Sequence, residues 1–211
     1  MLTALYLILS VLFAYLIWQT SSIKKNNYAL LLLLVLIGLF YDTFIIGIGS
    51  FIGEGDLLKT LNAGRFYVHA LLTPTMIIFG FGILRKAGVK WAQNKTAHIM
   101  ICVFATLLIS LGAYSDILQL DLQTKTITDI LRYINEGGMK GPPIPAVLTI
   151  IFLIVAGISL WRNTSWKWLA VGAVLMFIAA GAGMGDKFYI GNVGEVILGF
   201  TNVYTARKFL T

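Results

Sequence analysis

Polar and ionisable side chains recur at regular spacing within long apolar stretches of this sequence. Arg65, His69 and Thr73 follow one another at intervals of four residues, and this spacing places them on one face of a helix. Asp42 follows Tyr41 in another apolar stretch. A third set is spaced by three, four and three residues and comprises Asn192, Glu195, Gly199 and Asn202. Ionisable groups cost about 2.5–3.5 kcal/mol to insert into a membrane and usually face the protein interior, so these residues are candidates for an internal polar site.

The side-chain types define the chemistry that such a site can perform. The planar fork of Arg65 suits an anionic group such as a phosphate or a carboxylate. His69 is a candidate general acid–base or metal ligand. Asp42 and Glu195 are candidates to orient His69, activate water or hold a cation. We therefore predict a catalytic group of His69, Asp42 and Glu195, and a substrate-binding group of Arg65, Tyr41, Thr73, Tyr114, Asp116 and Asn192.

A purely structural role for the same residues is the main alternative. Arg65 can pair with Asp42 or Glu195 and so lock three helices together, or it can extend towards the membrane surface. Mixed metal ligation also stays open, with the candidate ligands His69, Asp42, Glu195 and Asp116. The sequence contains no Walker loop, nucleophile elbow or His-Glu-x-x-His motif, and it leaves the metal and the cofactor unknown.

Composition indicates which elements position these residues. The 211-residue chain is 58% hydrophobic and 12% charged, whereas a soluble domain is typically about 45–50% apolar and about 25% charged. A bilayer core needs about 20 mostly apolar residues per helix. Seven stretches qualify: 3–19, 28–50, 66–84, 97–114, 144–161, 166–184 and 188–206. They lack the alternation of barrel strands, so we predict an all-α polytopic membrane helix bundle with about seven transmembrane helices, forming a single domain over residues 1–211.

Basic residues in the connections predict the orientation of the bundle. Ten of the sixteen Lys and Arg residues fall after the first, third and fifth stretches or in the C-terminal tail: Lys24, Lys25, Arg85, Lys86, Lys90, Lys95, Arg162, Lys167, Arg207 and Lys208. The positive-inside rule places this side in the cytoplasm, with the N-terminus outside. The net charge of +7 comes from short basic clusters between apolar runs, which favours membrane orientation over nucleic-acid binding. We expect the protein in the cell (plasma) membrane.

The connection 115–143 is the longest polar segment, and it is expected outside. Within 128–136, the spacing of the apolar residues predicts a short surface helix; these residues are Ile130, Leu131, Tyr133 and Ile134. Pro74 predicts a kink in the third transmembrane helix, next to His69.

Three functions are compatible with this pattern. The first is an enzyme that acts on a lipid or amphiphile, by acid–base or metal-assisted chemistry, in a polar pocket in the outer half of the bilayer. The second is a small-solute or ion transporter of three-plus-one-plus-three helix organisation, and the third is a non-catalytic membrane sensor or partner protein. A transport path must be polar on both sides of its site, and the inner half offers few polar residues, so the first function is favoured. The expected partners are membrane lipids and a lipid or small-molecule ligand.

Overall fold

A computed structural model describes residues 1–23, 26–138, 141 and 143–211 of the chain. Within these residues there are eight α-helices and one two-stranded antiparallel sheet. The helices are α1 (Leu2–Ser21), α2 (Asn27–Ile52), α3 (Asp56–Leu72), α4 (Thr75–Lys86), α5 (Lys95–Ala113), α6 (Ile144–Thr164), α7 (Trp168–Ala182) and α8 (Tyr189–Phe209). The strands are β1 (Leu122–Ile127) and β2 (Ile130–Asn135). Short helical turns cover Lys90–Gln93, Tyr114–Leu118 and Gly185–Lys187.

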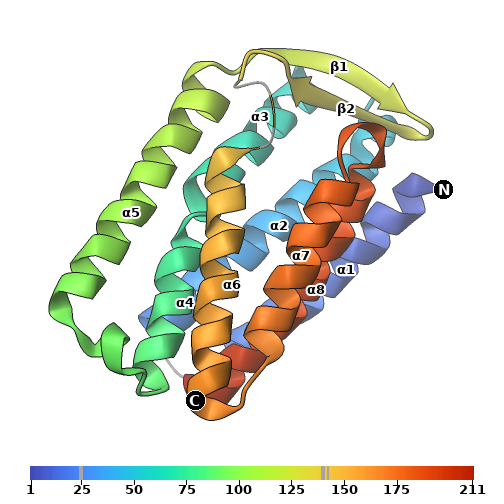
Figure 1. Ribbon diagram of the computed structural model, residues 1–211. Coiled ribbons are helices and arrows are strands. Elements are labelled where there is room, and N and C mark those ends of the chain that lie inside the picture. Colours follow the sequence, from blue (N-terminus) through green and yellow to red (C-terminus); the bar gives the residue numbers. More distant parts are fainter. Residues whose placement is uncertain (24–25, 139–140, 142) are drawn as a thin grey trace.

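The helices run between two ends of a bundle (Figure 1). The β-hairpin, the N-terminus and the α2–α3 and α7–α8 connections lie at one end, which we call the hairpin side. The C-terminus and the α4–α5 and α6–α7 connections lie at the other end, which we call the C-terminal side. Because α3 and α4 follow one another in a single pass, the eight helices make seven passes, as predicted.

Length and composition identify the bundle as an integral membrane protein. In the described chain, five helical segments are long and apolar enough to cross a membrane: Leu2–Ser21, Asn27–Ile52, Asp56–Lys86, Lys95–Leu118 and Ile144–Thr164. Helix α7 is apolar but has only 15 residues, and α8 is more polar. Large apolar side chains such as Val103 and Leu107 on α5 are exposed, as lipid contact requires. The prediction of an all-α membrane bundle is confirmed.

The third pass differs from its predicted range of 66–84. Helix α3 begins at Asp56, so Arg65 and His69 lie within a helix and not at its start. The polar first turns of α3 are stabilised by the hairpin, where the Tyr133 N–H donates to Asn62 at 3.2 Å. Pro74 has no N–H to donate to the helix, and the helix is interrupted between Leu72 and Thr75. The helix is therefore interrupted at Pro74, where the sequence predicts a kink, and this break separates α3 from α4.

The predicted surface helix within 128–136 is wrong, because the segment forms part of a β-hairpin. Ile127 pairs with Ile130, so Thr128 and Asp129 make a two-residue turn. Thr128 has φ +53°, a left-handed conformation that β-branched residues rarely adopt. The hairpin gains contacts that an isolated surface helix lacks. The Ser50 hydroxyl of α2 donates to the Asp129 carbonyl at 2.7 Å and accepts from the Leu131 N–H at 2.9 Å.

The turn of the hairpin also covers the start of α1. The Asp129 carboxylate accepts the Leu2 N–H at 2.9 Å and the Thr3 N–H at 3.2 Å, and it pairs with the Met1 ammonium. These bonds satisfy helix N–H groups that have no partner within α1. The Met1 ammonium, followed by these N–H groups, holds the pKa of Asp129 below its usual range. The hairpin is thus joined to α1, α2 and α3.

Helices α6 and α7 are closest near the C-terminal side. A side-chain carbon added to Gly157 of α6 would collide with the backbone of Ala170 in α7. Towards the hairpin side the two helices separate (Figure 1). The interior of the bundle is hollow between these separated ends.

Candidate functional site

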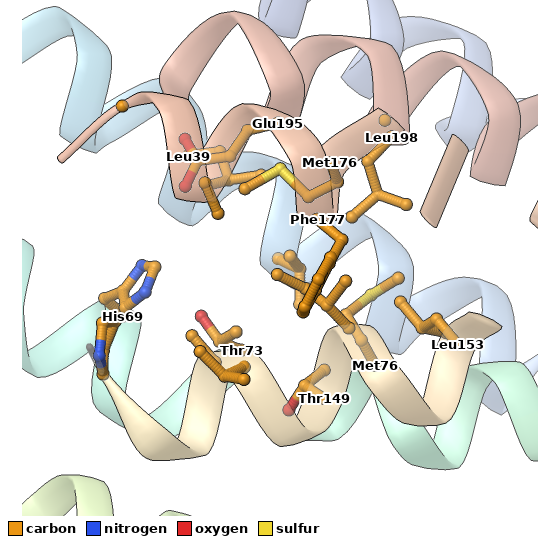
Figure 2. A pocket seen from close by; sticks show the side chains of 18 of the residues that line it. Leu39, His69, Thr73, Met76, Thr149, Leu153, Met176, Phe177, Glu195 and Leu198 are labelled. Atoms are coloured by element: carbon orange, nitrogen blue, oxygen red, sulfur yellow. The ribbon is translucent and has the colours of Figure 1, made fainter. Parts of the chain in front are cut away.

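A cavity of about 720 Å³ occupies the space between the diverging helices. It is lined by α2, by the junction of α3 and α4, and by α6, α7 and α8 (Figure 2). Most of the wall is apolar and includes Leu39, Met76, Leu153, Met176 and Phe177. Gly141, Pro143 and the α7–α8 connection also line it, so the cavity extends to the hairpin side. Its volume lies within the range of about 300–1,000 Å³ that is typical of small-molecule sites.

His69 and Glu195 bring ionisable groups to the cavity wall. His69 comes from α3 and Glu195 from α8, and both lie at the same end of the cavity in Figure 2. Thr73 follows His69 by one turn and also lines the cavity. Among the described residues, neither ring nitrogen of His69 has a hydrogen-bond partner. The imidazole is therefore free to bond to a molecule in the cavity.

The half-buried Asn192 and the buried Tyr6 hold the Glu195 carboxylate in place. Its Oε2 accepts from the Asn192 amide at 2.9 Å, and the Asn192 oxygen accepts from the Tyr6 hydroxyl at 2.5 Å. Tyr6 is completely buried and stacks on Phe188, with the ring centroids 5.8 Å apart. Glu195 thus has a fixed orientation towards the cavity.

Asp42 and Arg65 form an ion pair beside the cavity. The Arg65 Nε donates to Asp42 Oδ1 at 2.9 Å, and Nη1 donates to Asn62 Oδ1 at 2.6 Å. A void of about 10 Å³ between α2 and α3 is lined by Asp42, Arg65, His69 and Thr73, among others. Neither Asp42 nor Arg65 lines the main cavity. The Arg65 guanidinium is therefore used in joining α2 to α3, the structural alternative considered above.

The remaining predicted site residues lie away from the cavity wall. The Tyr41 hydroxyl donates to the Leu61 carbonyl at 2.8 Å and so joins α2 to α3. Tyr114 is exposed at the end of α5, and Asp116 accepts from the Ser115 hydroxyl at 3.1 Å. None of these three lines the cavity. The structure thus brings together His69, Thr73 and Glu195, with Asn192 behind Glu195 and the Asp42–Arg65 pair alongside.

No assembled metal site is present in the part of the chain that the structure describes. Within these residues, no group of three or more His, Cys, Asp and Glu side chains is placed to hold a metal ion. His69, Asp42, Glu195 and Asp116, the ligand set considered from the sequence, therefore do not form such a group.

Sequence reasoning misses three polar residues of this region: Tyr6, Asn62 and Arg132. Asn62 precedes Arg65 by three residues, so an earlier helix start would have placed both on one face. Tyr6 lies in an apolar stretch that gives no polar signal. The Arg132 guanidinium of β2 lies 3.6 Å from the centroid of the Phe188 ring. Burial, with repulsion from Arg65 as a smaller cause, lowers the pKa of Arg132 to about 10.

The chain matches no protein-family model, and no curated protein sequence is significantly similar to it. Inference of function therefore depends on the cavity and its polar residues.

Proposed function

We propose that the protein binds an amphiphile, such as a lipid, in the cavity and acts on its polar group by acid–base chemistry. The observation that carries this proposal is a large cavity with mostly apolar walls and with His69 and Glu195 at one end. Burial of an apolar tail stabilises the complex by about 25 cal/mol per Å². A few polar groups at one end then fix the orientation of the ligand.

His69 is the proposed acid–base group, because an imidazole exchanges a proton near neutral pH. Glu195 is proposed to accept a hydrogen bond or a proton from the polar group of the ligand, with Asn192 holding the carboxylate. Arg65 is assigned a positioning role, since its guanidinium already donates to Asp42 and Asn62. This assignment replaces the anion-binding role that its residue type suggests.

The proposal places the cavity in the outer half of the bilayer. In the described chain, basic residues gather at the C-terminal side, where the positive-inside rule puts the cytoplasm: Arg85, Lys86, Lys90, Lys95, Arg162, Lys167, Arg207 and Lys208. An amphiphile would then enter from the outer leaflet of the cell membrane, between the separated ends of α6 and α7.

The test compares His69→Gln and Glu195→Gln with wild type. Both variants are first shown to be folded by thermal unfolding in detergent, and bound lipids are identified by mass spectrometry of the purified protein. Loss of an acid–base group typically costs about 10²–10⁴-fold in rate. We therefore expect both variants to retain bound amphiphile and to lose conversion of it, measured as cellular lipid composition.

Tyr114→Phe is the matched control, because Tyr114 is exposed and does not line the cavity. It should behave as wild type. Folded His69→Gln and Glu195→Gln variants with wild-type lipid composition would contradict the acid–base role. Loss of solute flux in reconstituted vesicles, with lipid composition unchanged, would instead favour a transporter.

A further inference from the structure

Asn202 lies in the cavity wall as an amide without a hydrogen bond. The residue is 1% exposed and lines the cavity. Its Oδ1 is completely buried and has no partner, and among the described residues none bonds to either amide atom. Buried polar groups are nearly always hydrogen-bonded, and an unsatisfied one lowers stability. The Oδ1 has no surface open to the cavity, so the NH₂ group of this wall residue is the amide atom that a molecule in the cavity can reach.

The positions of Glu195 and Asn202 on α8 set the distance between two polar groups in the cavity wall. Both residues lie on α8, seven positions apart, which corresponds to about 10 Å along a helix and nearly two full turns. They therefore share one face of α8, and Leu198 and Gly199 line the wall between them. Thr149 of α6 also lines the cavity, but its hydroxyl already donates to the Pro145 carbonyl at 2.8 Å. The cavity thus has polar residues at two depths with an apolar wall between them.

We propose that Asn202 binds an oxygen-bearing group within the chain of the amphiphile, about 10 Å from the group that meets His69 and Glu195. This inference rests on the proposed function and specifies its ligand. The NH₂ group is a donor, so the oxygen of a hydroxyl or of a carbonyl in the chain satisfies it. A plain hydrocarbon chain would leave the amide unpaired. The preferred ligand is therefore an amphiphile with a hydroxyl or carbonyl in its chain.

The test uses two alcohols of equal chain length, a plain fatty alcohol and one with a second hydroxyl in mid-chain. Binding to the purified full-length protein in detergent is measured by calorimetry. We expect wild type to bind the hydroxylated chain about tenfold more tightly, the effect of one net hydrogen bond. Asn202→Leu should bind both chains equally. Tyr114→Phe, a change outside the cavity, should keep the wild-type preference.

A stability measurement without ligand gives a second readout. Asn202→Leu should unfold at the wild-type temperature or above it, because the amide that it removes has no partner. Asn192→Leu should unfold at a lower temperature, because it removes the bonds to Tyr6 and Glu195.

Equal affinity of wild type for the two alcohols would overturn the inference and leave amphiphile binding intact. A lowered unfolding temperature for Asn202→Leu would also overturn it, by showing that the amide is already satisfied, for example by water. Binding of neither alcohol would overturn the proposed function itself.

Discussion

At the scale of single residues, Arg65 shows how a charge is held between two helices. Its side chain is 8% exposed and that of Asp42 is 16% exposed, so both groups are largely removed from solvent. Asn62 supplies a second acceptor at 2.6 Å and also accepts from the hairpin. Removing one partner of a partly buried ion pair lowers the stability of the protein more than removing both partners together. The contribution of this pair can therefore be measured.

Asp42→Asn and Arg65→Gln should each destabilise the protein by about 2–3 kcal/mol, somewhat less than the value for fully buried pairs because Asp42 is partly exposed. The double variant should lose less unfolding free energy than the sum of the losses in the two single variants. Unfolding free energies in detergent for the four proteins complete the double-mutant cycle. Strictly additive losses would show that the two side chains do not interact.

The sequence predicts this pair only in part. The spacing of Arg65, His69 and Thr73 correctly indicates a shared helix face. It does not decide between Asp42 and Glu195 as the partner of Arg65, because that choice depends on how α2, α3 and α8 pack. Glu195 bonds to Asn192, and Asn192 to Tyr6, a residue 186 positions away in the chain. No local pattern contains such a contact.

At the scale of elements, the hairpin shows where the spacing of apolar residues fails to predict the secondary structure. The apolar residues within 130–134 fit a helix or a strand equally well, and the two-residue turn lacks the glycine that usually marks a hairpin. What stabilises the strands is their hydrogen bonding to distant residues, Ser50 and Asn62. The same contacts extend α3 back to Asp56. Tertiary contacts thus determine both elements that the sequence misassigns.

The contact between α6 and α7 leads to a prediction at this scale. Gly157→Ala should destabilise the protein by about 1–3 kcal/mol, because the added methyl group meets the backbone of Ala170, which cannot move aside as a side chain can. Gly191→Ala on α8 is the matched control, since nothing lies within 4 Å of its added carbon. It should be neutral or stabilising by up to about 1 kcal/mol. Thermal unfolding of both variants in detergent tests this, and equal stability would contradict a tight α6–α7 contact.

At the scale of the whole molecule, hydropathy reveals the seven passes but not the cavity between them. A side chain that faces lipid and one that faces an internal cavity are both apolar. Val103 of α5 is exposed outside the bundle, whereas Leu36 of α2 is 1% exposed and lines the cavity. The polar stripes at the end of α3, with His69 and Thr73, and of α8, with Glu195 and Asn202, indicate internal faces from the sequence.

The two ends of the bundle carry different charges, and this difference predicts its orientation. With Cys102 replaced by Ala, single cysteines at Thr124 and Gln93 report on the hairpin side and the C-terminal side respectively, and both positions are exposed. A membrane-impermeant maleimide added to intact cells should label Thr124→Cys. It should label Gln93→Cys only after the cells are permeabilised, because the positive-inside rule keeps the basic side in the cytoplasm. Labelling of both cysteines in permeabilised cells is the control. The reverse result in intact cells would place His69 and Glu195 in the cytoplasmic half of the membrane, and the amphiphile would then have to enter from the inner leaflet.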